Sequence, residues 1–335
     1  MPSRRLGGRA RRRRAHRRRR WRDWADGLPM DALLAIFHRL DHIVVLTAAD
    51  NVCRSWRRAA RDEPTLWRRV AMRGREGVAA RLNRCGLACE AVRRSAGRCE
   101  AFCGEHAGDD GFLIYLSERA TCLKSLRLIS CNGVTDEGFT EAMKELPLLE
   151  ELELSLCKNV SAEAYEVVGK VCPQLKHFRL SKLRFDIREW NKDKDARGIA
   201  TMHRLHSLQL FGNAITNDGL VTILDNCSQL ESLDIRHCFN IEMDDDETLL
   251  PKSARIKTLR LPDDPIDDYD LHFESPVRSY IDDDVSWSSD CYDSCSYDNY
   301  EDYEESDFFG EPSRYEDDLD RYDKMLPLSM RTFLK

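Results

Sequence analysis

One spacing of leucines recurs at a nearly constant interval through the middle of this 335-residue chain. It first appears as Leu123-x2-Leu126-x-Leu128, and further copies begin at Leu149, Leu175, Leu205, Leu230 and Ile256. Successive first positions are 26, 26, 30, 25 and 26 residues apart. A segment of this length holds one strand and one helix and cannot bury its own apolar face. The copies are therefore expected to stack, with parallel strands on the inside and helices on the outside.

The second half of each copy predicts the helix. Val134 to Phe139 (VTDEGF) recurs as Ile215 to Leu220 (ITNDGL), and a looser version lies between them. Thr135, Ser161 and Thr216 stand where a helix N-cap is expected, because their side-chain oxygens can accept from backbone N–H groups of the first turn. Acidic residues follow each of them, as the helix dipole favours.

Cysteines recur at matching positions of the leucine copies. Cys131, Cys157 and Cys238 follow the predicted strands, and Cys172 and Cys227 end the predicted helices. With these cysteines the pattern resembles the cysteine-containing class of leucine-rich repeats, a class often found behind an F-box. We interpret the cysteines as small buried hydrophobic residues.

Side chains alternate along a strand, so the residues between the buried leucines are expected on the concave face of the stack. This face carries basic, acidic and neutral stripes, which suit a polar surface for an unknown protein substrate. Ile129 and Phe211 are expected to be exposed there as apolar anchors. The candidate substrate-binding residues are Arg127, Ile129, Glu151, Glu153, His177, Arg179, Gln209, Phe211, Asp234 and Arg236. The alternative is that these charges only satisfy one another. Trp190, in an insertion of the third copy, is a further candidate anchor.

A second feature lies before the repeats, between Leu28 and Trp67. Leu33, Ile36, Phe37 and Leu40 have the spacing of one apolar helical stripe. Val52 and Trp56 begin another stripe, and a Pro-Thr-Leu-Trp segment closes the unit. About forty residues with this much apolar surface cannot bury it alone. The stripe is therefore expected to be covered by a neighbouring domain or a partner. The alternative is an ordinary helical bundle that has no role outside its own chain.

These residues resemble an F-box nearly position for position. The resemblance implies docking onto a Skp-type adaptor, and through it onto the cullin scaffold of an SCF ubiquitin ligase. The family's positions do not reveal which residues touch the adaptor and which fill the bundle. The candidate adaptor-binding residues are Leu28, Pro29, Ile36, Phe37, Leu40, Val52, Cys53, Trp56, Leu66 and Trp67.

The two ends of the chain carry opposite charge. Residues 1–22 hold twelve arginines and no acid, whereas residues 263–335 hold 23 acids against six lysines or arginines. Few aliphatic residues occur in either arm, so the basic arm is expected to be disordered and the acidic arm to be mostly disordered or only partly ordered. The basic arm fits a nuclear localisation signal, a nucleic-acid contact or a segment without a role. The acidic arm fits a solubilising tail, a phosphorylation segment or a partner for the arginines.

Several classes of site are not expected. No catalytic constellation and no phosphate-binding loop can be recognised, so the protein is predicted to be no enzyme and to use no cofactor. The thirteen cysteines form no CxxC pair, which argues against a metal site, and reduced thiols are expected. No apolar run approaches the roughly 20 residues that a membrane helix requires.

The sequence thus predicts an α/β fold in which a helical F-box precedes a short leucine-rich-repeat solenoid. We expect a substrate-recognition adaptor of an SCF ligase in the nucleus and/or cytoplasm, which binds no membrane and for which nucleic acid is not the expected partner. A repeat scaffold without ligase docking, or a nucleic-acid-associated protein acting through the basic arm, are the alternatives. The expected segments are a disordered arm (1–21), the F-box (22–70), a helical connector with a degenerate first repeat (71–122), the repeats (123–262) and the acidic tail (263–335).

Overall fold

A computed structural model describes residues 28–73, 83–182, 191–243 and 248–269 of the chain. The first of these segments is helical. Two α-helices and a 3-10 turn are followed by a third α-helix and a second 3-10 turn. Their bounds are α2 (Met30–Phe37), α3 (His42–Thr47), η1 (Ala49–Asn51), α4 (Arg54–Asp62) and η2 (Pro64–Trp67).

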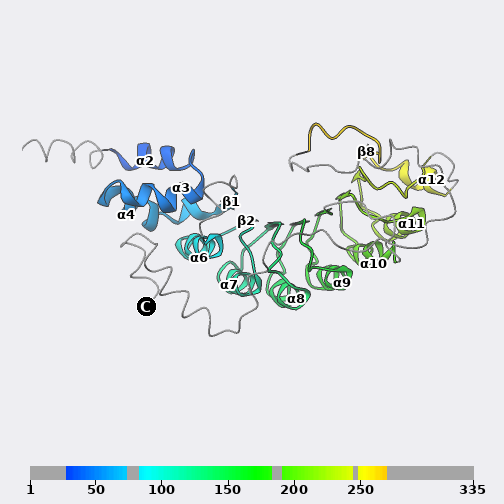
Figure 1. Ribbon diagram of the computed structural model, residues 1–335, viewed down its shortest axis with the longest axis horizontal. Helices are drawn as coiled ribbons and strands as arrows, with labels where there is room; N and C mark the ends of the chain where they lie inside the picture. Colours follow the sequence, from blue (N-terminus) through cyan, green and yellow to red (C-terminus); the bar gives the residue numbers. More distant parts are fainter. Residues whose placement is uncertain (1–27, 74–82, 183–190, 244–247, 270–335) are drawn as a thin grey trace, which may run out of the picture. The chain divides into compact units, whose positions relative to one another are not determined.

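The rest is built on one parallel sheet of eight strands, in which every strand pairs with its neighbour in sequence. The strands are β1 (Arg69–Met72), β2 (Ala101–Glu105), β3 (Ser125–Ile129), β4 (Glu151–Ser155), β5 (His177–Ser181), β6 (Ser207–Phe211), β7 (Ser232–Asp234) and β8 (Thr258–Arg260). Between them run α6 (Arg84–Arg94), α7 (Asp110–Arg119), α8 (Asp136–Lys144), α9 (Ala162–Val171), α10 (Lys194–Ile199), α11 (Asn217–Asn226) and α12 (Leu249–Ser253). Helices α6 to α11 lie in a row on one side of the strands (Figure 1).

The core lies between the sheet and this row of helices. The repeated leucines, such as Leu126 and Leu128 of β3, are completely buried. Aromatic side chains from strand and helix meet in the same layer: the rings of Phe178 in β5 and Tyr165 in α9 lie 5.7 Å apart. Each repeat buries its apolar surface only against neighbouring repeats, so the stack as a whole forms the core.

A ladder of carboxylates joins successive repeats at the helix N-termini. Asp136, in the first turn of α8, accepts hydrogen bonds from the backbone N–H and the hydroxyl of Ser161, both at 2.6 Å. Asp110 binds Thr135 in the same way, at 2.8 Å for both bonds. Asp193 repeats the arrangement with Thr216, again at 2.8 Å. The acid and N-cap residues of the sequence motif therefore stabilise the stacking as well as their own helix.

This ladder explains the glycine in the recurring motif. A Cβ atom added to Gly138 would lie 2.1 Å from the Asp110 carboxyl carbon. At Gly219 the added atom would lie 2.2 Å from a carboxylate oxygen of Asp193. Glycine is therefore required at these helical positions because the ladder carboxylate of the preceding repeat occupies the space of a side chain.

The predicted fold class is confirmed: a helical N-terminal unit precedes a parallel sheet with helices on one side. The sheet begins earlier than the leucine copies indicate, because β1 directly follows η2 and residues 71–122 already contain α6, β2 and α7. Residues 263–269 belong to the tail that was expected to be mostly disordered, and they pack against the sheet. The basic arm, the insertion with Trp190 and the remaining tail lie outside the described residues.

Candidate functional site

Three of the predicted adaptor-binding residues lie in the interior of the helical bundle. Phe37, Leu66 and Trp67 are at most 3% exposed, so an adaptor has no access to them in this arrangement. Phe37 packs edge-to-face on Trp56, with ring centroids 5.4 Å apart. The Trp67 indole N–H donates to the Ala60 carbonyl at 2.7 Å. The sequence left open which candidates fill the bundle, and these three do so, since a forty-residue unit needs its large aromatic side chains to form a core.

The outer surface of the bundle keeps several apolar side chains exposed. Ile36 and Val52 are 37% and 48% exposed, and Pro29 is exposed as well. Leu28, Leu40, Cys53 and Trp56 are half-buried. The sequence prediction missed Met30 and Val44, which are 51% and 40% exposed. Val44 lies in an apolar run whose other three members are buried, so periodicity could not single it out.

The bundle is bonded to the first strand–helix unit through a buried charge cluster. Arg94 of α6 binds the carboxylate of Asp50 in η1, and Glu90 accepts from the same guanidinium at 2.6 Å. The guanidinium also lies 5.3 Å from the centre of the Trp67 ring. A buried charge pair of this kind holds a defined geometry, because either charge left alone would be costly. The helical bundle therefore has a fixed connection to the sheet.

His42 adds a second connection between bundle and sheet. Its Nδ1 atom accepts from the Ala71 N–H in β1 at 3.3 Å. The other ring nitrogen lies 3.2 Å from the Leu66 carbonyl and therefore carries the proton. Burial lowers the pKa of His42 below its ordinary value, which favours this neutral form.

The middle positions of the strands form one row across the open face of the sheet. The register aligns Arg127, Glu153, Arg179, Gln209, Asp234 and Arg260. Glu153 is only 2% exposed and accepts from Arg127 and from the Ser155 hydroxyl. Arg179 lies 3.7 Å from it on the other side. Gln209 donates to Asp234 at 3.1 Å. Much of the predicted charge striping is therefore satisfied between neighbouring strands.

The other predicted residues of the face differ in their exposure to solvent. Glu151 accepts from the Ser125 hydroxyl at 2.8 Å, and His177 is exposed beside it. The prediction that Ile129 and Phe211 are exposed anchors is wrong, since they are 2% and 4% exposed. Both residues end their strands, and the chain turns immediately after them. Phe211 is covered by aromatic rings, with His237 stacked on it at 4.6 Å and Tyr269 at 4.4 Å.

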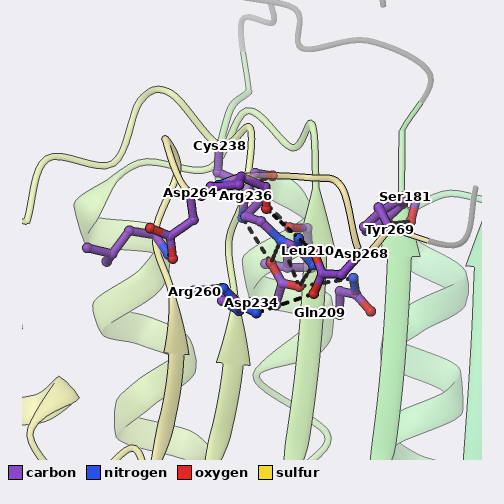
Figure 2. A network of polar contacts seen from close by, with 12 residues as sticks. Ser181, Gln209, Leu210, Asp234, Arg236, Cys238, Arg260, Asp264, Asp268 and Tyr269 are labelled. Carbon is purple, nitrogen blue, oxygen red and sulfur yellow. Dashed lines mark hydrogen bonds and ion pairs between the residues drawn. The ribbon is translucent and has the colours of Figure 1, made fainter. Parts of the chain in front are cut away.

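Arg236 is the centre of a polar network near the end of the sheet (Figure 2). Its guanidinium binds Asp234 at 2.7 Å and Asp268 at 2.5 Å, and it also donates to the Pro265 carbonyl at 2.9 Å. Arg260 contacts the second oxygen of Asp268 at 3.3 Å. Hydrogen bonding to Arg236 lowers the pKa of Asp268. The sequence prediction included Arg236 but not Asp268, which it placed in the mostly disordered acidic tail.

Comparison with known proteins matches both parts of this architecture. The F-box-like family model matches residues 25–73, and a leucine rich repeat model matches residues 202–224. The F-box protein SKIP19 of Arabidopsis thaliana is 38% identical over 296 residues, which cover 85% of this chain and 94% of that protein. The chain belongs to the F-box/LRR-repeat family.

A second relative shows a comparable identity. F-box/LRR-repeat protein 22 of the same plant is 40% identical over 257 residues, 74% of this chain and 79% of the relative. Among solved structures, the yeast Rad7 and Elc1 complex aligns with a TM-score of 0.41 at 14% identity, over 76% of this chain and 64% of that chain. The family assignment makes the helical bundle the F-box and the sheet with its helices the LRR unit.

Among the described F-box and LRR residues, no three His, Cys, Asp or Glu side chains gather in a way that would hold a metal ion. Four of the repeat cysteines (Cys131, Cys172, Cys227 and Cys238) are buried as predicted, whereas Cys157 is only half-buried. Burial raises the pKa of Cys172 to about 12 and of Cys227 to about 11. These thiols are therefore protonated and unreactive at neutral pH. Within the same residues, no helix has the length and apolarity to span a bilayer.

Proposed function

We propose that this protein is the target-recognition subunit of an SCF-type ubiquitin ligase. In this role the F-box docks a Skp-type adaptor, which links the chain to a cullin, and the open face of the LRR sheet binds a protein to be ubiquitinated. The observation that carries the proposal is the exposed apolar surface of the F-box, with Ile36 and Val52 as its members from the predicted set. Exposed apolar side chains of this kind favour a protein–protein contact.

The chain's own contribution is proximity. F-box/LRR proteins act as adaptors, so ubiquitin transfer is the work of other subunits. A target held on the LRR sheet meets the loaded conjugating enzyme at a high effective concentration, which replaces a bimolecular encounter. The buried Arg94–Asp50 pair supports this role, because a defined joint between F-box and sheet restricts where the bound target can lie.

A paired set of surface variants tests the docking step. Ile36→Asp and Val52→Asp place a charge at exposed F-box positions, and Leu148→Asp does the same at a 44% exposed position between α8 and β4. Each full-length protein is used to capture a Skp-type adaptor and a cullin. We expect the wild type and the Leu148 variant to capture both, and the two F-box variants to lose them while their melting curves stay unchanged. If folded wild-type protein captures no adaptor, the protein is an LRR scaffold without ligase docking.

A further inference from the structure

The chain returns to the open face of the sheet after its last strand. Residues 261–269 follow β8, yet Tyr269 lies beside β5 and β6 rather than at the free edge of the sheet. Its hydroxyl is 2.6 Å from the Ser181 hydroxyl at the end of β5, and its ring is 4.4 Å from that of Phe211 in β6. Figure 2 shows Tyr269 beside Ser181. A segment that only capped the stack would cover the edge strand β8, and this one passes over the face instead.

The tyrosine ring is held between cationic groups. The guanidinium carbons of Arg179 and Arg236 lie 4.8 and 5.3 Å from the centre of the ring. Only 8% of Tyr269 remains exposed. Guanidinium groups favour the negative face of an aromatic ring, and the attraction increases when the site excludes water. This part of the face therefore has a place for an aromatic ring with a hydrogen-bonding tip.

The residue before the tyrosine is recognised separately. The Asp268 carboxylate receives Arg236 on one oxygen at 2.5 Å and Arg260 on the other at 3.3 Å. Charge-assisted contacts from two arginines select a carboxylate at this position. Asp268 remains half exposed, so the acid subsite is open to solvent whereas the ring subsite is closed.

We propose that this part of the LRR face, formed by Ser181, Arg179, Phe211, Arg236 and Arg260, is a binding site for a target peptide in which an acidic residue directly precedes a tyrosine. Asp268 and Tyr269 occupy the site as an intramolecular stand-in for that peptide. The assignment deepens the proposed function, and it rests on the role of this face as the target-binding surface. A target must displace the chain's own segment, whose covalent attachment gives it a high effective concentration.

Peptide binding to an emptied site tests the proposal. The probe is a fluorescently labelled peptide with the sequence of residues 263–269, DDPIDDY. Full-length protein is compared with the D268A/Y269A variant by fluorescence anisotropy. Because Asp302 and Tyr303 repeat the same pair in the tail, both proteins carry D302A/Y303A so that this segment cannot fill the site. We expect the D268A/Y269A protein to bind the probe at least about tenfold more tightly, as expected when a tethered competitor is removed.

Two controls separate specific from general binding. A probe with alanine in place of its tyrosine should bind the emptied protein at least about tenfold more weakly, since it loses the stacked ring. Arg260, which is 44% exposed, can be changed without opening the core. Arg260→Gln should weaken binding of the probe that has aspartate directly before its tyrosine. It should leave the binding of a probe with asparagine at that position unchanged.

Either of two results overturns the proposal. Equal binding to both proteins would show that Asp268 and Tyr269 do not occupy the site. Absence of binding to the emptied protein, with an unchanged circular dichroism spectrum, would show that the segment is only a structural cover. If D268A/Y269A impairs folding, Asp268→Asn with Tyr269→Phe is the milder replacement and the same comparison applies. The adaptor is absent from these measurements, so loss of F-box docking and loss of peptide binding are separate outcomes.

Discussion

Arg94 of α6 donates to both carboxylate oxygens of Asp50 in η1, at 3.2 and 2.7 Å, and the two side chains are 3% and 4% exposed. The residues are 44 positions apart and belong to different units, the LRR and the F-box. Their contact joins the first LRR helix directly to the F-box. Stability and geometry of the two units are therefore linked through one buried ion pair.

Removing one member of this pair is expected to be strongly destabilising. Arg94→Ala leaves the Asp50 carboxylate buried without its main partner, which costs about 3–5 kcal/mol in comparable cases. Denaturant unfolding of the full chain measures the loss. Arg93→Ala is the control on the same helix, because its ion pair with Glu90 is exposed at the arginine end and should contribute about 1 kcal/mol or less. Equal losses for the two variants would contradict the structural role of Arg94.

The carboxylate ladder predicts a clear difference between two adjacent acids. Asp136→Ala removes both hydrogen bonds to Ser161 and should cost about 1–3 kcal/mol. Glu137→Ala changes the next residue, which is exposed, and should alter the free energy of unfolding by at most about 0.5 kcal/mol. Urea midpoints of the two variants check the difference. A small effect for both would mean that neighbouring repeats do not depend on this bond.

Two helical glycines should respond in opposite directions to the same change. Alanine normally favours a helix by about 1 kcal/mol over glycine. Gly111→Ala meets only one atom, at 3.6 Å, so it should stabilise the protein or leave it unchanged. Gly138→Ala should destabilise it, because the new methyl group would overlap the Asp110 carboxylate at 2.1 to 2.4 Å.

A double variant can isolate this clash. Asp110→Ala removes the group that occupies the space, so the added cost of Gly138→Ala should be smaller in the Asp110→Ala background than in the wild type. The thermal unfolding midpoints of the four proteins give the coupling. Strict additivity would show that the carboxylate is not what excludes a side chain at residue 138.

The neutral state of His42 predicts a pH dependence. Burial lowers the pKa of the folded protein below the unfolded value near 6.5, so the neutral ring's contribution to stability is present above that value. It is lost as the pH falls through the folded pKa, since protonating Nδ1 removes the acceptor of the Ala71 N–H. The free energy of unfolding should therefore decrease on acidification below about pH 6.5. His42→Gln should flatten this part of the profile, whereas a change at exposed His177 should not.

The strand positions and the register of the LRR sheet could be predicted because they follow from spacing. Leucines at matching positions of successive copies, such as Leu126 and Leu152, pair across neighbouring strands and face the helices. The same spacing predicts which residues alternate with them, and Arg127, Glu153 and Arg179 do form one row. It could not predict the exposure of Ile129 and Phe211, because exposure depends on where the chain goes after each strand.

The sequence by itself determined the family, the order of F-box and repeats, and the row of residues across the open face, since each depends on local spacing that recurs along the chain. Only the tertiary structure decided that Phe37, Leu66 and Trp67 fill the bundle while Ile36 and Val52 remain exposed. It also decided that Asp50 meets Arg94 and that Tyr269 reaches Ser181, 88 residues away. The physical reason is the same in each case: these contacts join segments with no common periodicity, and they form only when the stacked repeats bring those segments together.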